Sequence, residues 1–407
     1  MTMSSPELDL PAAFAHLNGA IEPVAAVEQV ATARAAGRVL AAAVASSVDL
    51  PAFDAAAMDG YALRSSDTVA APLELQVVGS VLAGSVFGAR ISAGQCVRIM
   101  TGAPMPQDGD AILVLEEAEW HADRLRVKAP VAAGRHCRVR GEHVAAGETV
   151  LHPGRRLRGT DLGLAASAGV AALAVFRRLR VGVLSTGDEL VDPPEPLVGA
   201  RVYDANRAFL LAALQRDGTE AFDLGIVGDS AEALAASLAH AERLGLDAII
   251  TTGGAAQGDA DVVRRTSGVQ YLPLAIRPGR GLAFAQRVAS RPLVLLGLPG
   301  NAVAAFVVFQ LLARPATRRL GGEVAQLPRA IPLPLASNLD CKPGRVDFQR
   351  ARLVSAPCGG LAVHPLAQQG SAMLRTISEA DALVAIGPAS SYRAGDLVDT
   401  FLLSTME

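Results

Sequence analysis

The sequence has few cysteines and no recognisable cysteine motif. Only four cysteines occur in 407 residues, at positions 96, 137, 341 and 358, and no two of them form a C-x-x-C pair. This scatter disfavours a disulfide framework, so we expect a reduced, cytoplasmic protein. His136, Cys137 and His143 lie close together along the chain, but their spacing fits no standard zinc motif, which disfavours a metal site there.

Long apolar runs are absent as well, although 51% of the residues are hydrophobic. A membrane-spanning helix needs about 20 consecutive apolar residues, and charge or glycine interrupts every run here sooner, so no membrane partner is expected. The N-terminal sequence MTMSSPELDLPAAFAHL lacks the basic segment and apolar core of a signal peptide. The net charge of −3 gives no indication of a nucleic-acid partner. The length predicts two or three domains of roughly 150 residues each.

Several common catalytic motifs are also missing. The chain has no G-x-x-x-x-G-K-[ST] phosphate-binding loop and no G-x-G-x-x-G after a strand, which disfavours P-loop nucleotidases and dinucleotide-binding enzymes. It has neither a G-x-S-x-G nucleophile elbow nor an H-E-x-x-H metal motif. The chemistry of this protein must therefore be sought in polar residues on turns.

Residues 179–314 alternate short apolar strands with helices. The expected strands are RLRVGVLS, AFDLGIVG, DAIITT and RPLVLLG, and the expected helices begin at Asp204, after Asp229, after Asp259 and after the sequence LPG. Such alternation predicts an α/β domain with a doubly wound parallel sheet. Ligands bind beyond the carboxyl ends of such strands, so the loops STGDEL, TTGGAAQGDAD and GLPGN are expected to converge.

The rest of the chain has other patterns. Residues 47–146 contain short alternating strands separated by glycine and proline turns, which predict a β-rich domain. Residues 20–45 are rich in alanine and are expected to be helical, and residues 147–178 lead through turns into a second helix. From residue 329 onward, short strands return and predict a small antiparallel sheet or barrel.

The stretch IITTGGAAQGDADVV, residues 249–263, combines a buried strand end with glycines and acids. Glycine lets backbone N–H groups approach an anion closely, whereas acids repel an anion unless a cation lies between them. Asp259 and Asp261 therefore favour a phosphate-bearing ligand that is handled together with a divalent cation. The alternative is an ordinary strand–turn–helix corner in which the aspartates cap the next helix.

A second group of acids lies in PAFDAAAMDGYALR, which contains Asp54 and Asp59. Phe53, Met58 and Tyr61 would give these carboxylates apolar shielding, and such shielding makes a carboxylate useful as an acid, a base or a metal ligand. The alternative is that Asp59 and Gly60 form a hairpin turn.

Three further positions suit a phosphate ligand. Thr101 and Gly102 end a strand with a hydroxyl and a permissive backbone. Gly300 and Asn301 precede a helix, where free N–H groups favour phosphate, although Asn301 also suits an ordinary helix cap. IRPGRGLAF adds two arginines, Arg277 and Arg280, that suit either phosphate recognition or a solvated surface.

Taken in order, these segments resemble the molybdopterin molybdenumtransferase family, of the MoeA and gephyrin E-domain type. The ordered motifs are PAFDxxxMDGYA, IMTGAPMP, RxxGE, STGDEL with DxN, TTGGxxxGDxD, PGR and LPGN. The late segments GRVDFQRARL and QGSAMLRTISEADALVAI also look like this family. The resemblance covers almost the whole chain.

The resemblance implies an elongated, multidomain subunit that forms a homodimer, with the active cleft between the α/β domain of one subunit and the β-rich arm of the other. The implied parts are a linking domain of residues 27–46 and 147–178, an arm of residues 47–146, an α/β domain of residues 7–26 and 179–328, and a barrel-like C-terminal β domain of residues 329–407. A molybdopterin adenylyltransferase and molybdoenzyme maturation proteins are the further partners that it suggests.

The implied activity is insertion of molybdenum from molybdate into adenylylated molybdopterin, with Mg²⁺-dependent hydrolysis of the adenylate and release of AMP and molybdenum cofactor. Matching positions for catalysis are Asp59, Thr101, Glu189, Asp229 and Asp261, of which Asp59 and Glu189 would hold the metal. Matching positions for substrate binding are Thr186, Gly187, Asp188, Thr252, Gly253, Gly254, Asp259, Arg277, Arg280, Pro299, Gly300, Asn301 and Ser371. The two arginines would stabilise charge at the cleaved phosphoanhydride.

The sequence departs from the family pattern at several positions. Ala255, Ala256 and Gln257 replace a Val-Ser-Val segment, which removes a hydroxyl that could bind phosphate. Two family lysines are the arginines 277 and 280, the proline and serine after LPGN are alanines 302 and 304, and the acid that usually follows GE is a histidine at 143. One lost hydrogen bond typically costs about 1–3 kcal/mol of affinity, which tunes an enzyme rather than abolishing it.

Two other functions remain open at this point. A catalytically weak or inactive relative that carries molybdenum cofactor, or acts as a scaffold, would explain the altered phosphate loops. The related adenylyltransferase shares only the α/β domain, and the additional N-terminal and C-terminal parts of this chain argue against it.

Overall fold

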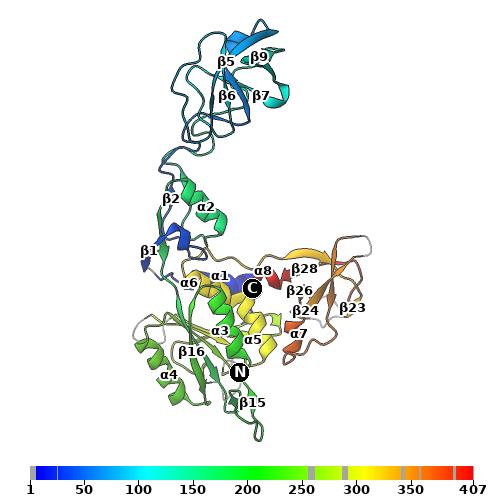
Figure 1. Ribbon diagram of the computed structural model, residues 1–407. Helices are drawn as coiled ribbons and strands as arrows, with labels where there is room; N and C mark the ends of the chain where they lie inside the picture. Colours follow the sequence, from blue (N-terminus) through cyan, green and yellow to red (C-terminus); the bar gives the residue numbers. More distant parts are fainter. Residues whose placement is uncertain are drawn as a thin grey trace.

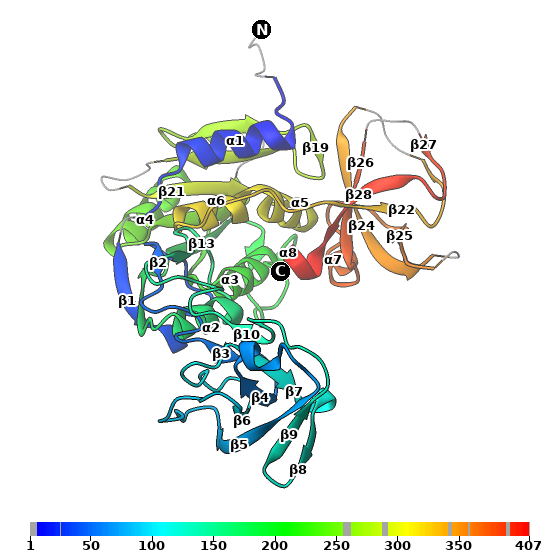
Figure 2. The ribbon, with the colours of Figure 1, turned by 90° about the horizontal axis from the view of Figure 1, so that it is seen from above.

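The computed structural model describes residues 6–24, 26–254, 262–286, 292–340, 344–356, 359–387 and 391–406. The molecule is elongated (Figure 1). The arm lies at one end and the linking segments form a narrow connection, while the α/β region and the C-terminal β region lie side by side at the other end (Figures 1 and 2). Among the described residues, no helix is long and apolar enough to cross a membrane.

A six-stranded sheet organises the α/β region, with the strand order β16-β13-β17-β21-β20-β18. The strands are β13 (Arg180–Thr186), β16 (Glu220–Val227), β17 (Ala248–Thr252), β18 (Gln270–Pro273), β20 (Gly281–Ala285) and β21 (Val294–Leu298). The first three strands and β21 are parallel, as expected, but β20 runs antiparallel to β21 and β18 antiparallel to β20. The expectation of a wholly parallel sheet was therefore wrong, because the short connection of residues 274–280 brings β20 back beside β18 without a helical crossover.

Helices cover both faces of this sheet. The helices on one face are α1 (Leu10–Ala20), α3 (Asn206–Arg216) and α5 (Ala302–Val308), which continues through a π-helical turn (Phe309–Ala313) into α6 (Arg314–Leu320). On the other face lies α4 (Ala231–Arg243), which packs Leu234 and Leu238 against the strands. The doubly wound arrangement is confirmed.

Two helix predictions in this region need correction. Helix α1 was not expected, although Asp9 caps it by accepting a hydrogen bond from the Ala12 N–H at 2.8 Å. The helix expected after Asp259 is not found in the described part of that segment, where residues 262–269 form turns. A turn suffices here because Val262 and Val263 already bury their side chains in the core.

The expectation of a helix over residues 20–45 was also wrong. The described residues after α1 form strand β1 (Val27–Ala31), a 3-10 turn (Thr32–Arg34) and strand β2 (Val44–Ala45). β1 pairs with β12 (Ala172–Phe176) and β2 with β11 (Thr149–Leu151), while α2 (Gly159–Ser167) packs beside them. Alanine favours helix only weakly, and pairing with distant strands overrides that preference.

The arm is β-rich, as predicted. Its sheet has the order β7-β4-β6-β5-β9-β8. The strands are β4 (Gly60–Leu63), β5 (Leu73–Val81), β6 (Gln95–Ile99), β7 (Ala111–Val114), β8 (Glu119–His121) and β9 (Arg124–Val127). A separate pair joins β3 (Ala55–Ala56) to β10 (Cys137–Arg138). Because β3 does not pair with β4, Asp59 and Gly60 do not form a hairpin turn.

The C-terminal region forms a mainly antiparallel sheet, as expected. Its order is β19-β24-β26-β28-β22, with β25 paired to β24. The strands are β19 (Ile276–Arg277), β22 (Ile331–Pro334), β24 (Val346–Ser355), β25 (Leu361–Pro365), β26 (Ala382–Ile386) and β28 (Leu397–Leu402). β19 belongs by sequence to the α/β region, yet it runs parallel to β24. Phe348 and Phe401 join the main α/β core, so the two regions share one hydrophobic core.

Candidate active site

A cavity of about 580 Å³ opens beyond the carboxyl ends of β13, β17 and β21. The three loops that were expected to converge all contribute to its wall, so that prediction is confirmed. The predicted residues that line it are Thr186, Gly187, Glu189, Asp229, Thr252, Gly253, Gly254, Gly300 and Asn301. We call this cavity the strand-end pocket.

Glycine is required in the loop that follows β17. Gly253 has φ +87°, and a Cβ atom at this position would lie 2.3 Å from the Thr186 carbonyl oxygen. Gly254 has φ +60°, and its Cβ would lie 2.8 Å from the Thr186 hydroxyl oxygen. Any larger residue would force the two loops apart, so glycine brings the backbone of the loop against the end of β13.

Unpaired hydroxyl groups lie beneath this loop. The hydroxyl oxygens of Thr186, Ser185 and Thr251 are buried and have no hydrogen-bond partner within the described part of the chain. Buried polar groups are normally paired, and exceptions concentrate where a ligand or water completes the bonding. Since Thr186 lines the strand-end pocket, its hydroxyl is available to a bound polar ligand.

Asn206 joins two of the three loops, and the sequence analysis did not select it. Its Nδ2 donates hydrogen bonds to the Thr252 hydroxyl at 2.6 Å and to the Gly300 carbonyl oxygen at 2.7 Å. The same Thr252 hydroxyl donates to the Pro299 carbonyl oxygen at 3.2 Å. Asn206 is 7% exposed, and its Oδ1 has no partner among the described residues. The D-x-N sequence at the start of α3 was the only local signal.

A buried arginine supports the start of α3. Asp204 accepts hydrogen bonds from the Asn206 and Arg207 N–H groups and from Arg207 Nε, the last at 3.0 Å. The Arg207 guanidinium also pairs with Asp192 and Asp223. Burial opposes the charge of Arg207, but hydrogen bonds to Asp223 and Asp204 outweigh it and raise the pKa of Arg207. This network fixes the helix end from which Asn206 projects.

Three acids line the strand-end pocket: Asp204, which is paired with Arg207, and the exposed Glu189 and Asp229. Asp188 does not line the pocket but accepts a hydrogen bond from the Asp229 N–H at 3.2 Å. Mg²⁺ commonly takes one or two protein carboxylates and completes its shell with water and substrate phosphates, so this pair fits a magnesium site. No group of three potential metal ligands occurs in the ranges that the structure describes, which include His136, Cys137 and His143. Asp259 and Asp261 lie outside these ranges, as do residues 255–257.

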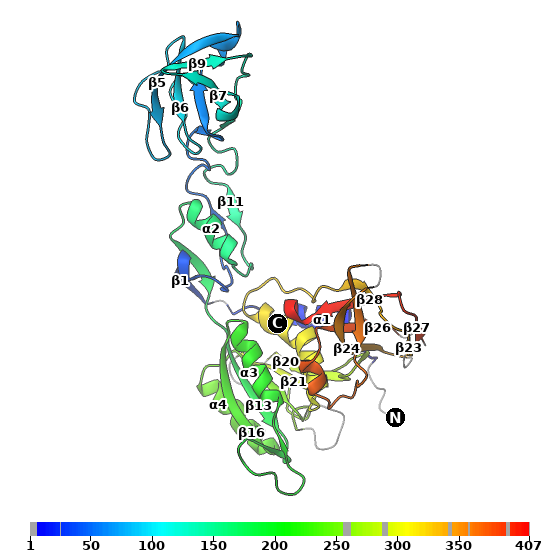
Figure 3. The same ribbon diagram turned by 45° about the vertical axis from the view of Figure 1, so that its right-hand side comes forward.

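Asp59 and Thr101 lie together, but in the arm. The Asp59 Oδ1 accepts hydrogen bonds from both the N–H and the hydroxyl of Thr101, each at 2.7 Å. These bonds lower the pKa of Asp59. The expected apolar shielding was wrong for this chain, because Phe53 and Met58 are 45% and 42% exposed and Asp59 itself is exposed. Within one chain, the arm lies far from the strand-end pocket (Figure 3).

The two predicted arginines lie apart. Arg277 and Ser371 line a separate cavity of about 700 Å³ between the α/β region and the C-terminal sheet. The Arg277 Nη1 is buried without a partner in the described residues. The Arg280 side chain is exposed, which fits a solvated surface. Together with Arg345, its positive charge lowers the pKa of Glu7. Arg280 lines neither of the two cavities, and its role at the phosphoanhydride stays a prediction.

The helix end at Asn301 also differs from an ordinary cap. Asn301 occupies the N-cap position of α5, but its side chain accepts no capping hydrogen bond. The polar group therefore stays available at the wall of the strand-end pocket. Ala302 begins α5 without a proline, so that substitution leaves the helix start intact.

Comparisons with known proteins show to which family this chain belongs. Three family models match successive parts of the chain: the MoeA N-terminal region (domain I and II) over residues 8–169, a probable molybdopterin binding domain over residues 182–319, and the MoeA C-terminal region (domain IV) over residues 332–403. The molybdopterin molybdenumtransferase of Haemophilus influenzae is 34% identical, with 86% of this chain and 87% of that protein covered. The chain belongs to the molybdopterin molybdenumtransferase family.

A second sequence relative and a solved structure support the same family membership. Molybdopterin molybdenumtransferase 2 of Mycobacterium tuberculosis is 36% identical over 79% of this chain and 82% of its own length. The crystal structure of the molybdopterin biosynthesis moeA protein from Pyrococcus horikoshii OT3 superposes with a TM-score of 0.84 at 25% identity, covering 98% of this chain and 100% of that one. The fold of the molybdopterin molybdenumtransferase family therefore extends over essentially the whole chain.

Proposed function

We propose that this protein inserts molybdenum from molybdate into adenylylated molybdopterin, hydrolyses the adenylate and releases AMP together with molybdenum cofactor. The observation that supports this proposal is the strand-end pocket, where glycine backbone, an unpaired Thr186 hydroxyl and the exposed carboxylates of Glu189 and Asp229 surround one cavity. This combination suits a phosphate-bearing ligand that is bound together with a cation.

The residues of the pocket have separable roles in this proposal. The amides of Gly254 and Gly300 and the side chains of Thr186 and Asn301 hold the phosphates, while the Gly253 N–H donates to the Leu298 carbonyl oxygen. Asn206 keeps the second and third loops in register. Glu189 and Asp229 orient the water that cleaves the phosphoanhydride: the water oxygen bonds to phosphorus, the P–O bond to the pterin phosphate breaks, and the proton passes to a carboxylate. Mg²⁺, when bound beside Glu189, supplies charge neutralisation at the phosphates.

Asp59 and Thr101 enter the site only from a second copy of the chain. The Thr101 bonds hold the Asp59 carboxylate ionised and oriented at an exposed position, which suits a group that completes a site on another subunit. A homodimer in which each arm reaches the strand-end pocket of the partner accounts for this exposure. In this arrangement, Asp59 joins Glu189 at the cation.

Arg277 and Ser371 are proposed to bind the oxyanion substrate in the neighbouring cavity. Arg277 carries a permanent charge and a buried, unpaired N–H group. Ser371 belongs to a segment whose next residue, Ala372, lines the strand-end pocket. In this proposal, the segment that contains Ser371 and Ala372 separates the molybdate in this cavity from the pterin in the strand-end pocket.

The test is an AMP-release assay on the purified protein, with molybdate omitted and then restored. Release that requires both Mg²⁺ and molybdate is expected. A folded protein that binds adenylylated molybdopterin but releases no AMP under any of these conditions would instead identify the carrier or scaffold alternative, which the altered residues 255–257 motivate.

A further inference from the structure

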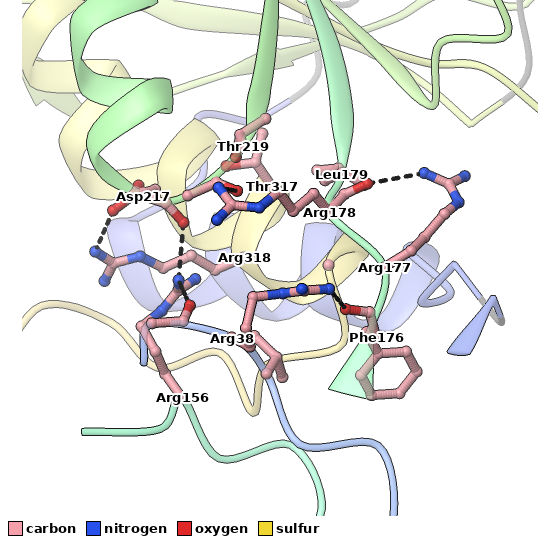
Figure 4. Close-up of a pocket in the computed structure, with 14 residues that line it drawn as sticks. Arg38, Arg156, Phe176, Arg177, Arg178, Leu179, Asp217, Thr219, Thr317 and Arg318 are labelled. Carbon is pink, nitrogen blue, oxygen red and sulfur yellow. Dashed lines mark hydrogen bonds and ion pairs between the residues drawn. The ribbon is translucent and has the colours of Figure 1, made fainter. Parts of the chain in front are cut away.

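A small cavity lies at the joint between the linking segments and the α/β region (Figure 4), and it shares no lining residue with the strand-end pocket. Three parts of the chain form it: the linking segments contribute Arg38 and Arg156, the end of α3 contributes Asp217, and α6 contributes Arg318. Its free volume is about 40 Å³. This space admits an ion of a few heavy atoms but not a nucleotide.

Positive charge exceeds negative charge at this joint. Arg38 pairs with Glu28, Arg156 with Glu323 and Arg177 with Asp247, whereas Arg314 and Arg318 share Asp217. Arg178 donates to the Gly218 carbonyl oxygen at 3.2 Å and has no carboxylate partner among the described residues. The six guanidinium groups are therefore balanced by four carboxylates.

The one carboxylate in the wall does not oppose an anion strongly. Asp217 receives hydrogen bonds from Arg314 at 2.6 and 2.7 Å and from Arg318 at 2.9 Å. Burial would raise the pKa of Asp217, but the arginines outweigh burial and lower it. The ionised Asp217 is thus neutralised by its own partners.

A buried donor at the same cavity lacks a partner. The Arg318 Nε is buried and has no hydrogen-bond acceptor within the described ranges. Arg38, Arg178 and Arg318 all line the cavity, and Figure 4 shows the Arg38 side chain below those of Arg178 and Arg318. An unpaired buried N–H group of an arginine is costly unless an acceptor completes it.

We propose that this joint is a binding site for a small tetrahedral oxyanion of the phosphate class, contacted by Arg38, Arg178 and Arg318. Arginine is the residue best suited to such oxygens, because its fork of N–H groups matches their spacing. A bound oxyanion would connect the linking segments to α6. It would therefore stiffen the connection on which the arm is mounted, independently of the chemistry at the strand-end pocket.

The first test is calorimetric titration of the full-length protein with phosphate, sulfate and molybdate in a chloride buffer. Arg178→Ala is the informative variant, because the Arg178 side chain is exposed and, within the described ranges, its hydrogen bond goes to the Gly218 carbonyl oxygen, so its loss spares the core. We expect this variant to lose one equivalent of oxyanion binding, or to bind that equivalent at least about tenfold more weakly. Arg90→Ala, which removes an exposed arginine of the arm, is the matched control and should bind like the parent.

The second test is direct location of the ion. Crystals soaked in selenate are expected to show an anomalous peak enclosed by Arg38, Arg178 and Arg318. Phosphate should also raise the thermal unfolding midpoint of the parent by more than that of Arg178→Ala. Equal binding by Arg178→Ala and Arg90→Ala, absence of the peak, or binding of AMP alone at the joint would overturn the proposal. None of these readouts depends on AMP release.

Discussion

The Asn206 side chain donates a hydrogen bond of 2.6 Å to the Thr252 hydroxyl and so ties helix α3 to the end of strand β17. The bond is buried, and the same nitrogen reaches the Gly300 carbonyl oxygen in the third loop. One amide group thereby sets the spacing of two of the loops that surround the strand-end pocket.

Replacing Asn206 by alanine should therefore weaken both stability and activity. We expect a loss of about 1–3 kcal/mol in the free energy of unfolding, because two buried acceptors lose their donor, and a fall of at least about tenfold in AMP release. Urea unfolding and the AMP assay measure the two effects. Thr252→Ser keeps the hydroxyl and should behave like the parent, whereas Thr252→Ala should resemble the Asn206 variant. Normal turnover in Asn206→Ala would contradict the positioning role.

Gly253→Ala should be much more damaging than an ordinary glycine substitution. The added Cβ would lie 2.3 Å from a backbone oxygen in addition to being strained at φ +87°. Gly84 is a matched control, since it has φ +83° but no atom within 4 Å of the added Cβ. We expect a loss of about 1 kcal/mol for Gly84→Ala from strain alone and about 2–4 kcal/mol for Gly253→Ala. Similar unfolding curves for the two variants would show that close packing at Thr186 is unimportant.

The hydrogen bond from the Thr101 hydroxyl should account for part of the lowering of the pKa of Asp59. The Thr101 N–H contributes first and the hydroxyl second, and both favour the ionised carboxylate. Thr101→Val is expected to move the pKa of Asp59 up toward its ordinary value, and Thr101→Ser to leave it low. The stabilisation that these two hydrogen bonds give is therefore fully present above the pKa of an aspartate in the unfolded chain. It is lost as the pH falls through the lower pKa of Asp59 in the folded protein. Carbon-detected NMR titration of the aspartate side chains measures this shift, and an unmoved Thr101→Val titration would contradict it.

Mixing two inactive variants tests the shared site. Asp59→Asn and Glu189→Gln should each abolish AMP release alone. If each site combines the arm of one copy with the pocket of the other, dissociated and reassociated mixtures should recover about a quarter of the parental activity, because half of the dimers are mixed and each carries one intact site. If the mixture stays inactive although mass spectrometry detects mixed dimers, Asp59 of one subunit and Glu189 of the other do not form one shared site.

Asp217→Asn should destabilise the protein strongly. The side chains of Arg314 and Asp217 are 3% and 7% exposed, so Asp217→Asn removes a carboxylate charge that compensates a buried guanidinium. We expect a loss of about 3–5 kcal/mol in the free energy of unfolding. The lowered pKa of Asp217 also means that its stabilisation persists above the pKa of the unfolded chain and disappears in acid. Glu119→Gln removes an exposed ion pair and should leave the unfolding curve unchanged, which makes it the control.

The parallel strands of the α/β region and the convergence of their three loops could be predicted from the sequence. Apolar runs that end in Thr-Gly or Pro-Gly carry that information locally. Residues 27–45 were misjudged because their strand partners lie more than a hundred positions away, at residues 149–151 and 172–176. Asn206 was missed for the same reason, since its partners are 46 and 94 positions away. Local composition gives no indication of such bonds.

Strand β19 has a practical consequence for anyone who wishes to dissect this protein. Its two residues pair with β24 of the C-terminal sheet, and Phe348 and Phe401 belong to the same hydrophobic core as the residues of α5. A truncated chain that stops at residue 328 would expose this seam to solvent and present an open strand edge. Such fragments would aggregate during expression, so the C-terminal region has to be studied through point substitutions in the intact polypeptide.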